Sequence, residues 1–159
     1  MKVEYVSPFA EASINVLAKL IDCRPERGNL SARSQLSTSQ QINLVCSITG
    51  QVEGLVIYGM STMTADKLVS KITGEPVAVF DQASASAIAE FGNMISGQSA
   101  SLLTDQGFNC DITPPTIIRG TNVSVTALDT PALVIQMNIP NIGLLEINVS
   151  LQERKKLAA

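Results

Sequence analysis

Histidine is absent from this chain of 159 residues, tryptophan is absent too, and aromatic residues make up only 4%. Without an imidazole, the chain lacks the commonest general base and the usual nitrogen ligand of zinc. Nucleophile triads that depend on histidine are therefore excluded. No glycine-rich phosphate loop is present either. The scarcity of aromatic residues predicts a core built mainly from Val, Ile, Leu and Ala.

Cysteine is scarce as well, and its spacing carries no motif. Cys23, Cys46 and Cys110 lie far apart and form no C-x-x-C pair. Such cysteines are typical of reduced, mostly buried thiols. No apolar run is long enough to span a membrane, and the N-terminus lacks the basic and apolar regions of a secretory signal. The sequence thus predicts a cytoplasmic protein without a membrane partner.

A concentration of positive charge is also missing. The formal net charge is −3 and the isoelectric point is about 4.9. The one dense basic run, at residues 154–156, is interpreted as a solvated tail. Nucleic acid is therefore not expected as a partner.

What the chain does contain is enough apolar material for a folded domain. Hydrophobic residues make up 45% of the sequence and charged residues 16%, which is typical of a globular protein. A length of 159 residues suits one domain with a sizeable core. We therefore expect residues 1–159 to form a single domain.

The order of the predicted elements indicates the fold class. Hydrophobic periods, caps and turn residues predict three helices: one that Ser7 caps and Pro8 begins and that ends before Arg24, one that Thr64 caps and that ends at Gly74, and a long one from Asp81 to near Gly107. Strands are predicted at 2–6, 42–48, 53–60, 121–128, 131–139 and 143–151, and the second and third of these form a hairpin whose second strand is central. Residues 24–40 are predicted as a polar loop or an irregular edge segment. Short connections between successive strands imply antiparallel pairing. The sequence thus predicts an α+β fold in which long helices pack on one face of an antiparallel sheet.

One face of the long helix is polar. At about 100° per residue, Ser86, Glu90, Asn93 and Gly97 fall within about 60° of one another. The opposite side carries Ser84, Ile88, Phe91, Ile95 and Leu102. Because a helix buries its apolar stripe, the polar face is expected to look outward, where a partner could dock. The same pattern also fits an ordinary solvated helix surface.

Two glycines inside this helix need an explanation, since each costs a helix interior roughly 1 kcal/mol relative to alanine. Gly92, Ser96 and Ala100 form a row of small residues at four-residue spacing, which predicts that another helix crosses there. Gly97 belongs to the polar face, where its lack of a side chain leaves the backbone open to a partner.

The first predicted helix contains a segment similar in sequence to part of the long helix. Residues 9–15 resemble residues 88–93, and each helix is followed by a pair of strands. Glu11 and Asn15 are less well aligned than Glu90 and Asn93, because the second asparagine stands one position later and so about 100° further round the helix. Either the domain is a duplicated unit in which only the second copy keeps the polar pair, or two amphipathic helices resemble each other by chance.

Three motifs carry a resemblance to a known family. They are Ser86-x-x-x-Glu90-x-x-Asn93, the surrounding Glu-Phe-Gly-Asn-Met, and Asp-Ile-Thr-Pro-Pro at 111–115. Together they resemble the CheC/CheX/FliY phosphatases of bacterial chemotaxis, and most of all the CheX type. The similarity extends through residues 48–54 and the first helix, so it covers most of the chain. It implies a CheC-like sheet with long helices on one face.

The resemblance also implies an activity, the hydrolysis of the aspartyl phosphate on a response regulator, typically phosphorylated CheY. In that family an asparagine orients the attacking water and a glutamate contacts a lysine of the regulator; here they correspond to Asn93 and Glu90. Ser86 matches the first motif position, and Gly97 and Pro114 are expected where the partner binds. Mg²⁺ is expected on the partner's receiver domain, so no cofactor or metal of the chain's own is expected.

The chemistry of the residues agrees with this activity. A carboxamide has one acceptor and two donors, enough to hold a water and to face a phosphoryl oxygen. Positioning is the largest contribution to phosphoryl transfer, so the lack of histidine does not stand against it. The alternative is a CheX-like module that binds a response regulator without hydrolysing anything. CheX-type proteins also form homodimers by pairing edge strands, and the strands within 121–151 are the candidates here.

Overall fold

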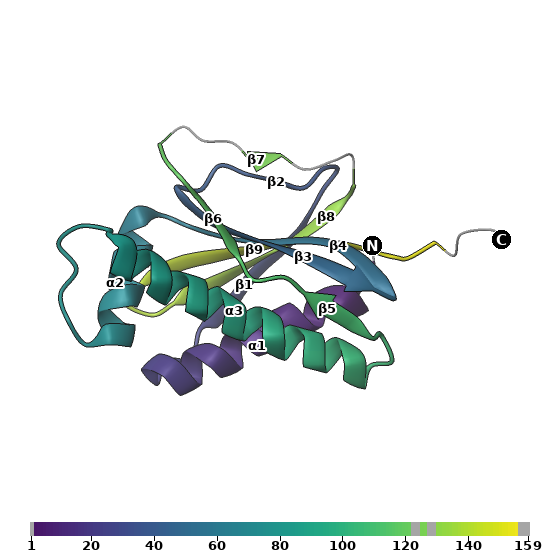
Figure 1. Cartoon of the computed structure of the whole chain (residues 1–159), viewed down its shortest axis with the longest axis horizontal. Coiled ribbons are helices and arrows are strands. Elements are labelled where there is room, and N and C mark those ends of the chain that lie inside the picture. Colours follow the sequence, from purple (N-terminus) through teal and green to yellow (C-terminus); the bar gives the residue numbers. More distant parts are fainter. Residues whose placement is uncertain (1, 122–124, 127–129, 156–159) are drawn as a thin grey trace.

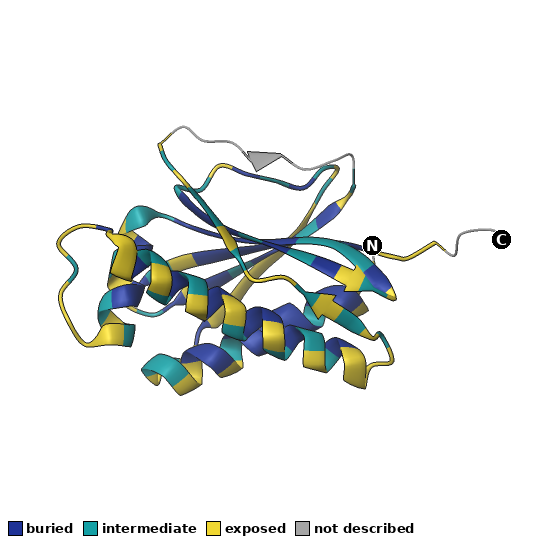
Figure 2. Ribbon diagram, in the orientation of Figure 1, coloured by how far each residue is buried: buried dark blue, intermediate teal, exposed yellow. Residues whose placement is uncertain are grey.

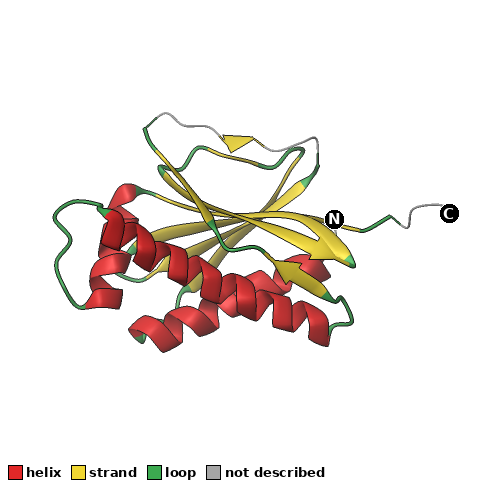
Figure 3. Ribbon diagram, in the orientation of Figure 1, coloured by secondary structure: helices red, strands yellow, loops and turns green. Residues whose placement is uncertain are grey.

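In the computed structural model, the chain forms an antiparallel sheet with helices on one of its faces (Figure 1, Figure 3). The structure describes residues 2–121, 125–126 and 130–155. The helices are α1 (Val3–Ile21), α2 (Thr62–Thr73) and α3 (Gln82–Asp105). The strands are β1 (Glu26–Arg33), β2 (Ser37–Thr38), β3 (Ile42–Gly50), β4 (Val52–Met60), β5 (Cys110–Ile112), β6 (Thr116–Arg119), β7 (Val125–Thr126), β8 (Ala132–Ile139) and β9 (Gly143–Glu153). The predicted α+β class, with helices on one face of an antiparallel sheet, is confirmed.

The hydrophobic core lies between the helices and the sheet (Figure 2). The sheet contributes Tyr58 and Leu44, and the helices contribute Phe9, Leu17 and Phe91, all of them at most 1% exposed. This burial is what selects the inward face of each amphipathic helix. In the part of the chain that the structure describes, no helix is both long and apolar enough to cross a membrane.

The strand order has an internal symmetry. The main sheet runs β1-β8-β9-β4-β3-β5, with β6 also paired to β3. The chain divides into a first half of α1 followed by β1 to β4, and a second half of α3 followed by β5 to β9. In each half the strand that follows the helix pairs with the hairpin of the other half: β1 pairs with β8, and β5, followed by β6, pairs with β3. This exchange supports an internal repeat rather than a chance similarity of two helices.

The N-terminal prediction is wrong, because residues 2–6 belong to α1 and do not form a strand. Tyr5, Val6 and Phe9 are buried on one side of this helix, at the spacing of helical turns. Ser7 is not the cap, and Pro8 lies inside the helix. A proline there removes one backbone hydrogen bond, and the burial of the surrounding apolar face outweighs that loss.

The ends of α2 and α3 are set by their caps. Ser61, and not the predicted Thr64, caps α2, and its Oγ accepts a hydrogen bond from the Thr64 N–H at 3.1 Å. Gly74 ends that helix with a φ of 75°, as predicted. Asp81 caps α3, also as predicted, and its Oδ1 accepts from the Ser84 N–H at 2.9 Å.

The polar segment 24–40 is an edge segment, one of the two readings that the sequence left open. It contains β1, which lies at one end of the sheet and is almost wholly exposed. The Arg33 guanidinium anchors it by donating to Glu146 Oε1 at 3.3 Å and to Asn148 Oδ1 at 3.1 Å. Both acceptors are buried on β9, so a paired charge fixes the segment across the sheet.

The hairpin of β3 and β4 is confirmed, and β4 is central as predicted. The strands predicted at 131–139 and 143–151 are confirmed as β8 and β9. Each has partners on both sides, so the prediction that they offer a free edge for dimerisation is wrong. The strand predicted at 121–128 lies mostly outside the described residues; its described part, β7, pairs with β2. The short strands β5 and β6 were not predicted.

Candidate functional site

The long helix α3 has one buried and one exposed face, and the residues fall on these faces as predicted (Figure 2). Ile88 and Ile95 are fully buried and Phe91 is 1% exposed. The exposed face carries the four polar or small residues that the sequence singled out, Ser86, Glu90, Asn93 and Gly97. The amphipathic period thus places all four on one surface of the helix.

Glu90 and Asn93 stand one turn apart on this surface, as residues at i and i+3 do. Among the described residues, neither side chain makes a hydrogen bond or an ion pair. Ser86 also has no such partner among them, so it makes no hydrogen bond to Glu90. A carboxylate and a carboxamide therefore stand side by side with their hydrogen-bonding groups available to a partner.

The two glycines of α3 have different surroundings. A β-carbon at Gly97 would meet nothing within 4 Å, so packing inside the chain does not require glycine there. A β-carbon at Gly92 would stand 2.8 Å from Leu44 Cδ1 of β3. Ser96 contacts the sheet too, through a 2.9 Å hydrogen bond with the Tyr58 hydroxyl of β4. At Gly92 and Ser96 the close neighbours are therefore strands and not the predicted crossing helix, although α1 does pack against α3.

The connector between β5 and β6 flanks the exposed face of α3. Pro115 Cγ would lie 3.7 Å from a β-carbon at Gly92, one residue before Asn93. Pro114 is exposed. The connector is pinned to β3 by two hydrogen bonds of 2.9 Å, from the Thr113 N–H to the Ser47 carbonyl and from the Ser47 N–H to Thr113 Oγ1. The sequence indicated Pro114 for partner binding, whereas the proline next to the helix in the structure is Pro115.

The start of α3 is also held in place. Arg119, in β6, donates to the Phe80 carbonyl at 2.9 Å, and its guanidinium lies 5.1 Å from the centre of the Phe80 ring. The next residue, Asp81, caps the helix, and hydrogen bonds from the Ser84 N–H and hydroxyl keep the pKa of the Asp81 carboxyl below its usual range. This clamp was not predicted, because a contact between residues 39 positions apart leaves no local pattern.

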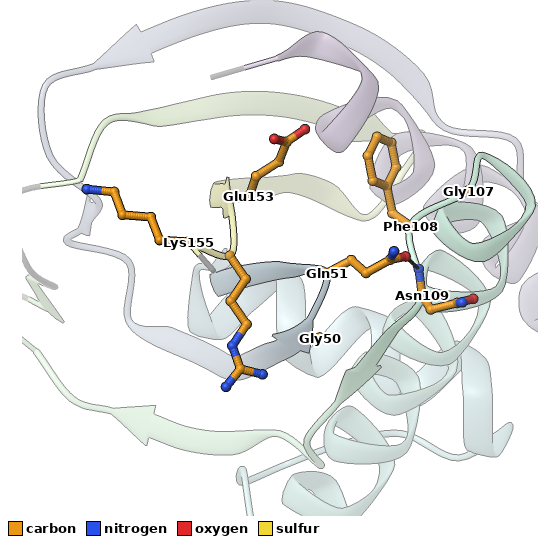
Figure 4. A pocket seen from close by; sticks show the side chains of 8 residues that line it. Gly50, Gln51, Gly107, Phe108, Asn109, Glu153 and Lys155 are labelled. Atoms are coloured by element: carbon orange, nitrogen blue, oxygen red, sulfur yellow. Dashed lines mark hydrogen bonds between the residues drawn. The ribbon is translucent and has the colours of Figure 1, made fainter. Parts of the chain in front are cut away.

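A hollow of about 680 Å³ lies elsewhere, near the C-terminal end of α3. Figure 4 shows that Lys155 extends away from Phe108 and Asn109, which line the other side. The Gln51 side chain is used by the fold, since its Oε1 accepts from the Asn109 N–H at 2.6 Å. The polar groups of this hollow therefore do not converge on one point, and we take the exposed face of α3 as the candidate site.

The polar pair of the similar segment on α1 is exposed as well. Glu11 and Asn15 both face outward, but their four-residue spacing differs from the three-residue spacing of Glu90 and Asn93.

Across the described residues, no group of three Cys, Asp or Glu side chains is close enough to hold a metal ion.

Comparisons with known proteins agree on one family. The family model described as chemotaxis phosphatase CheX matches residues 42–138. The protein named CheY-P phosphatase CheX from Thermotoga maritima is 32% identical over 126 residues, which are 79% of this chain and 81% of that protein.

Solved structures of CheX proteins have a similar fold. A CheX from Desulfovibrio desulfuricans has a TM-score of 0.84 and 23% identity, covering 95% of this chain and 99% of that one. The CheX of a CheX–CheY–BeF₃–Mg²⁺ complex from Borrelia burgdorferi has a TM-score of 0.80 and 28% identity, covering 96% and 100%. With the family model matching more than half of its length, this chain belongs to the CheX family of chemotaxis phosphatases.

Proposed function

We propose that this chain hydrolyses the aspartyl phosphate of a CheY-like response regulator, with Asn93 positioning the attacking water and Glu90 anchoring a lysine of the regulator. One observation carries the proposal: the two side chains stand together on the exposed face of α3, without partners among the described residues. The name of the relative from T. maritima and the CheX–CheY complex from B. burgdorferi support the same partner.

The proposed reaction needs little from this chain beyond position. The water oxygen forms the new bond to phosphorus, the bond from phosphorus to the aspartyl oxygen breaks, and both water protons leave on inorganic phosphate. Asn93 Oδ1 would accept a hydrogen bond from that water, while its amide would donate to a phosphoryl oxygen. Holding the water in line converts a bimolecular encounter into an oriented one, which is a large part of catalysis in phosphoryl transfer.

The remaining site residues have roles in binding within this proposal. Gly97 leaves room for the regulator's surface, since no neighbour in the chain explains a glycine there. Pro114 lies exposed on a connector that flanks α3, and Ser86 extends the contact towards the start of the helix. We propose that the chain needs no cofactor of its own, that Mg²⁺ belongs to the receiver domain, and that the reaction takes place in the cytoplasm.

A homodimer is part of the same proposal. The two ends of the main sheet are β1 on one side and β5 and β6 on the other. Because β6 lies next to α3 and its clamp at Phe80, pairing there would crowd the docking surface. We therefore propose β1 as the edge that pairs with a second copy.

The decisive experiment follows the decay of a phosphorylated receiver domain from the same organism, in Mg²⁺, with catalytic amounts of this protein. We expect multiple turnovers with the wild type and no acceleration with Asn93→Ala, while Asn93→Ala still binds the phosphorylated receiver. Asn15→Ala, which changes the exposed asparagine of α1, serves as the matched control and should retain turnover.

Three results would count against the proposal. Full activity in Asn93→Ala would remove that residue from the reaction. Saturable binding without acceleration would favour the non-catalytic regulator-binding module. Neither binding nor acceleration with any receiver domain of the organism would reject the assigned partner class.

A further inference from the structure

A pair of buried hydroxyl groups connects α3 to the sheet about one helical turn beyond Asn93. The Tyr58 hydroxyl, from β4, lies 2.9 Å from Ser96 Oγ. Tyr58 is fully buried and Ser96 is 1% exposed. Ser96 stands three positions after Asn93, almost one turn further along the helix and about 60° round it, on the buried side. Ser96 Oγ also lies 3.5 Å from Cys46 Sγ of β3, so one serine reaches two neighbouring strands.

This contact is made of neutral groups. Burial raises the pKa of the Tyr58 phenol well above its usual range, although the hydrogen bond with Ser96 opposes that shift. Burial also raises the pKa of the Cys46 thiol. The phenol and the thiol therefore keep their protons at neutral pH, and the hydrogen bonds do not depend on charge.

The hydrogen bond between Tyr58 and Ser96 adds a directional contact to the packing of α3, which is otherwise mainly hydrophobic. Buried side chains such as Ile88 and Ile95 hold α3 against the sheet, but hydrophobic burial is non-directional and tolerates small rotations of a helix. A hydrogen bond weakens steeply when its angle departs from linearity. One residue before Asn93, Gly92 brings the helix backbone close to Leu44 of β3. Contacts with the sheet thus hold α3 on both sides of Asn93 along the chain, at Gly92 through close packing and at Ser96 through a directional hydrogen bond.

We propose that Tyr58 and Ser96 are positioning residues for Asn93, and that their buried hydrogen bond sets the rotation of α3 at which the carboxamide can hold the attacking water. This inference rests on the proposed phosphatase function. Neither residue reaches the exposed face of the helix, so both act through the backbone of α3.

The proposal predicts a split between turnover and binding. A misplacement of about 1 Å at a reacting group can lower a rate by about 100-fold, whereas an exposed ion pair tolerates such a shift with little loss. Removing the Tyr58 hydroxyl should therefore lower kcat about tenfold while the KM for the phosphorylated receiver changes less than about twofold.

The test uses the intact chain, two variants of the hydroxyl pair and a matched control for each. Tyr58→Phe and Ser96→Ala each remove one hydroxyl of the pair. Tyr5→Phe is the matched control for the first, because the hydroxyl of the buried Tyr5 makes its 3.2 Å hydrogen bond to Glu153 of β9 and not to a residue of α3. Ser13→Ala is the control for the second, because Ser13 is a fully buried serine of α1 that donates to the Phe9 carbonyl at 2.7 Å.

Turnover, receiver affinity and thermal midpoint are measured for each variant, together with Asn93→Ala and a Tyr58→Phe/Ser96→Ala double variant. We expect Tyr58→Phe and Ser96→Ala each to lower kcat without changing KM. The kcat of the double variant should be no lower than that of the more affected single variant, since each single change already breaks the hydrogen bond. Amide hydrogen exchange along residues 90–97 should increase in Tyr58→Phe and not in Tyr5→Phe.

The possible results separate this inference from the proposed function. If the wild type shows turnover that Asn93→Ala abolishes, but Tyr58→Phe and Ser96→Ala keep the kcat of their controls, only the positioning role is overturned. A loss of kcat that merely follows the fraction of unfolded protein overturns it as well. If Tyr58→Phe does not fold, Ser96→Ala decides by the same criteria. A wild type without turnover that depends on Asn93 overturns the proposed function, and the positioning role with it.

Discussion

Pro115 lies against Gly92, so the connector between β5 and β6 passes α3 one residue before Asn93. A β-carbon at Gly92 would be 3.7 Å from Pro115 Cγ and 2.8 Å from Leu44 Cδ1. The helix is therefore enclosed at this turn by a strand on one side and a rigid proline on another. The exposed face of α3 at this turn therefore lies beside the connector.

Glu90→Ala should weaken binding of the phosphorylated receiver about three- to tenfold, because it removes a charge that we place against a lysine of the regulator. The affinity of the wild type should also fall more steeply with salt than that of the variant. Isothermal titration at two ionic strengths measures both effects. Glu11→Ala, an exposed glutamate of α1, is the control; equal affinities for wild type and Glu90→Ala would contradict the anchoring role.

Gly97→Ala should stabilise the fold by roughly 1 kcal/mol, since alanine is the better helix residue and its β-carbon would meet nothing within 4 Å. Gly97→Leu should fold equally well but bind the receiver less tightly, because its side chain occupies the docking surface. Thermal unfolding and receiver titration separate these effects. Gly92→Leu is the contrast: it overpacks against Leu44 and should destabilise by about 1–3 kcal/mol. Unchanged receiver affinity in Gly97→Leu would exclude this position from the interface.

Ile88→Asp should prevent folding at ordinary temperature, because it places an unpaired charge at a fully buried position at a cost of several kcal/mol, comparable to the whole stability of a marginally stable domain. Circular dichroism and thermal unfolding give the answer. Ser101→Asp, at an exposed position of the same helix, should fold normally. A cooperatively folded Ile88→Asp protein would show that the burial of this face is not required.

Asp81 should make the stability of the fold depend on acid. Its pKa in the folded state lies below the usual value, because the Ser84 N–H and then the Ser84 hydroxyl hydrogen-bond the carboxylate. The unfolded chain therefore takes up the proton first as the pH falls. The stabilisation is complete above the ordinary pKa of the carboxyl and is lost as the pH falls through the folded-state value.

The measurement for Asp81 is the thermal midpoint between about pH 6 and pH 3. Asp81→Asn keeps an oxygen that can cap α3 but has no proton to take up, so its midpoint should fall less over this range than that of the wild type. Parallel curves for the two proteins would show that the cap does not contribute to the acid dependence.

The outward face of α3 could be predicted because it depends only on the helical period. Ile88, Phe91 and Ile95 repeat at the spacing of one buried stripe, which leaves Glu90 and Asn93 outside. Caps made by residues close in sequence, such as Asp81 and Gly74, were likewise predictable. The N-terminal strand was wrong because five residues of mixed polarity do not distinguish a strand from the first turns of a helix.

By itself, the sequence determined which residues point inward, where the long helix begins, and that Glu90 and Asn93 share its polar face. Only the tertiary structure decided what lies behind and beside that face: Leu44 against Gly92, Tyr58 bonded to Ser96, and Pro115 along the helix. It also decided that β8 and β9 are interior and that β1 is an edge. The physical reason is that periodicity reports the direction of burial along a segment, whereas the partner across the core is set by strand order and packing between distant residues.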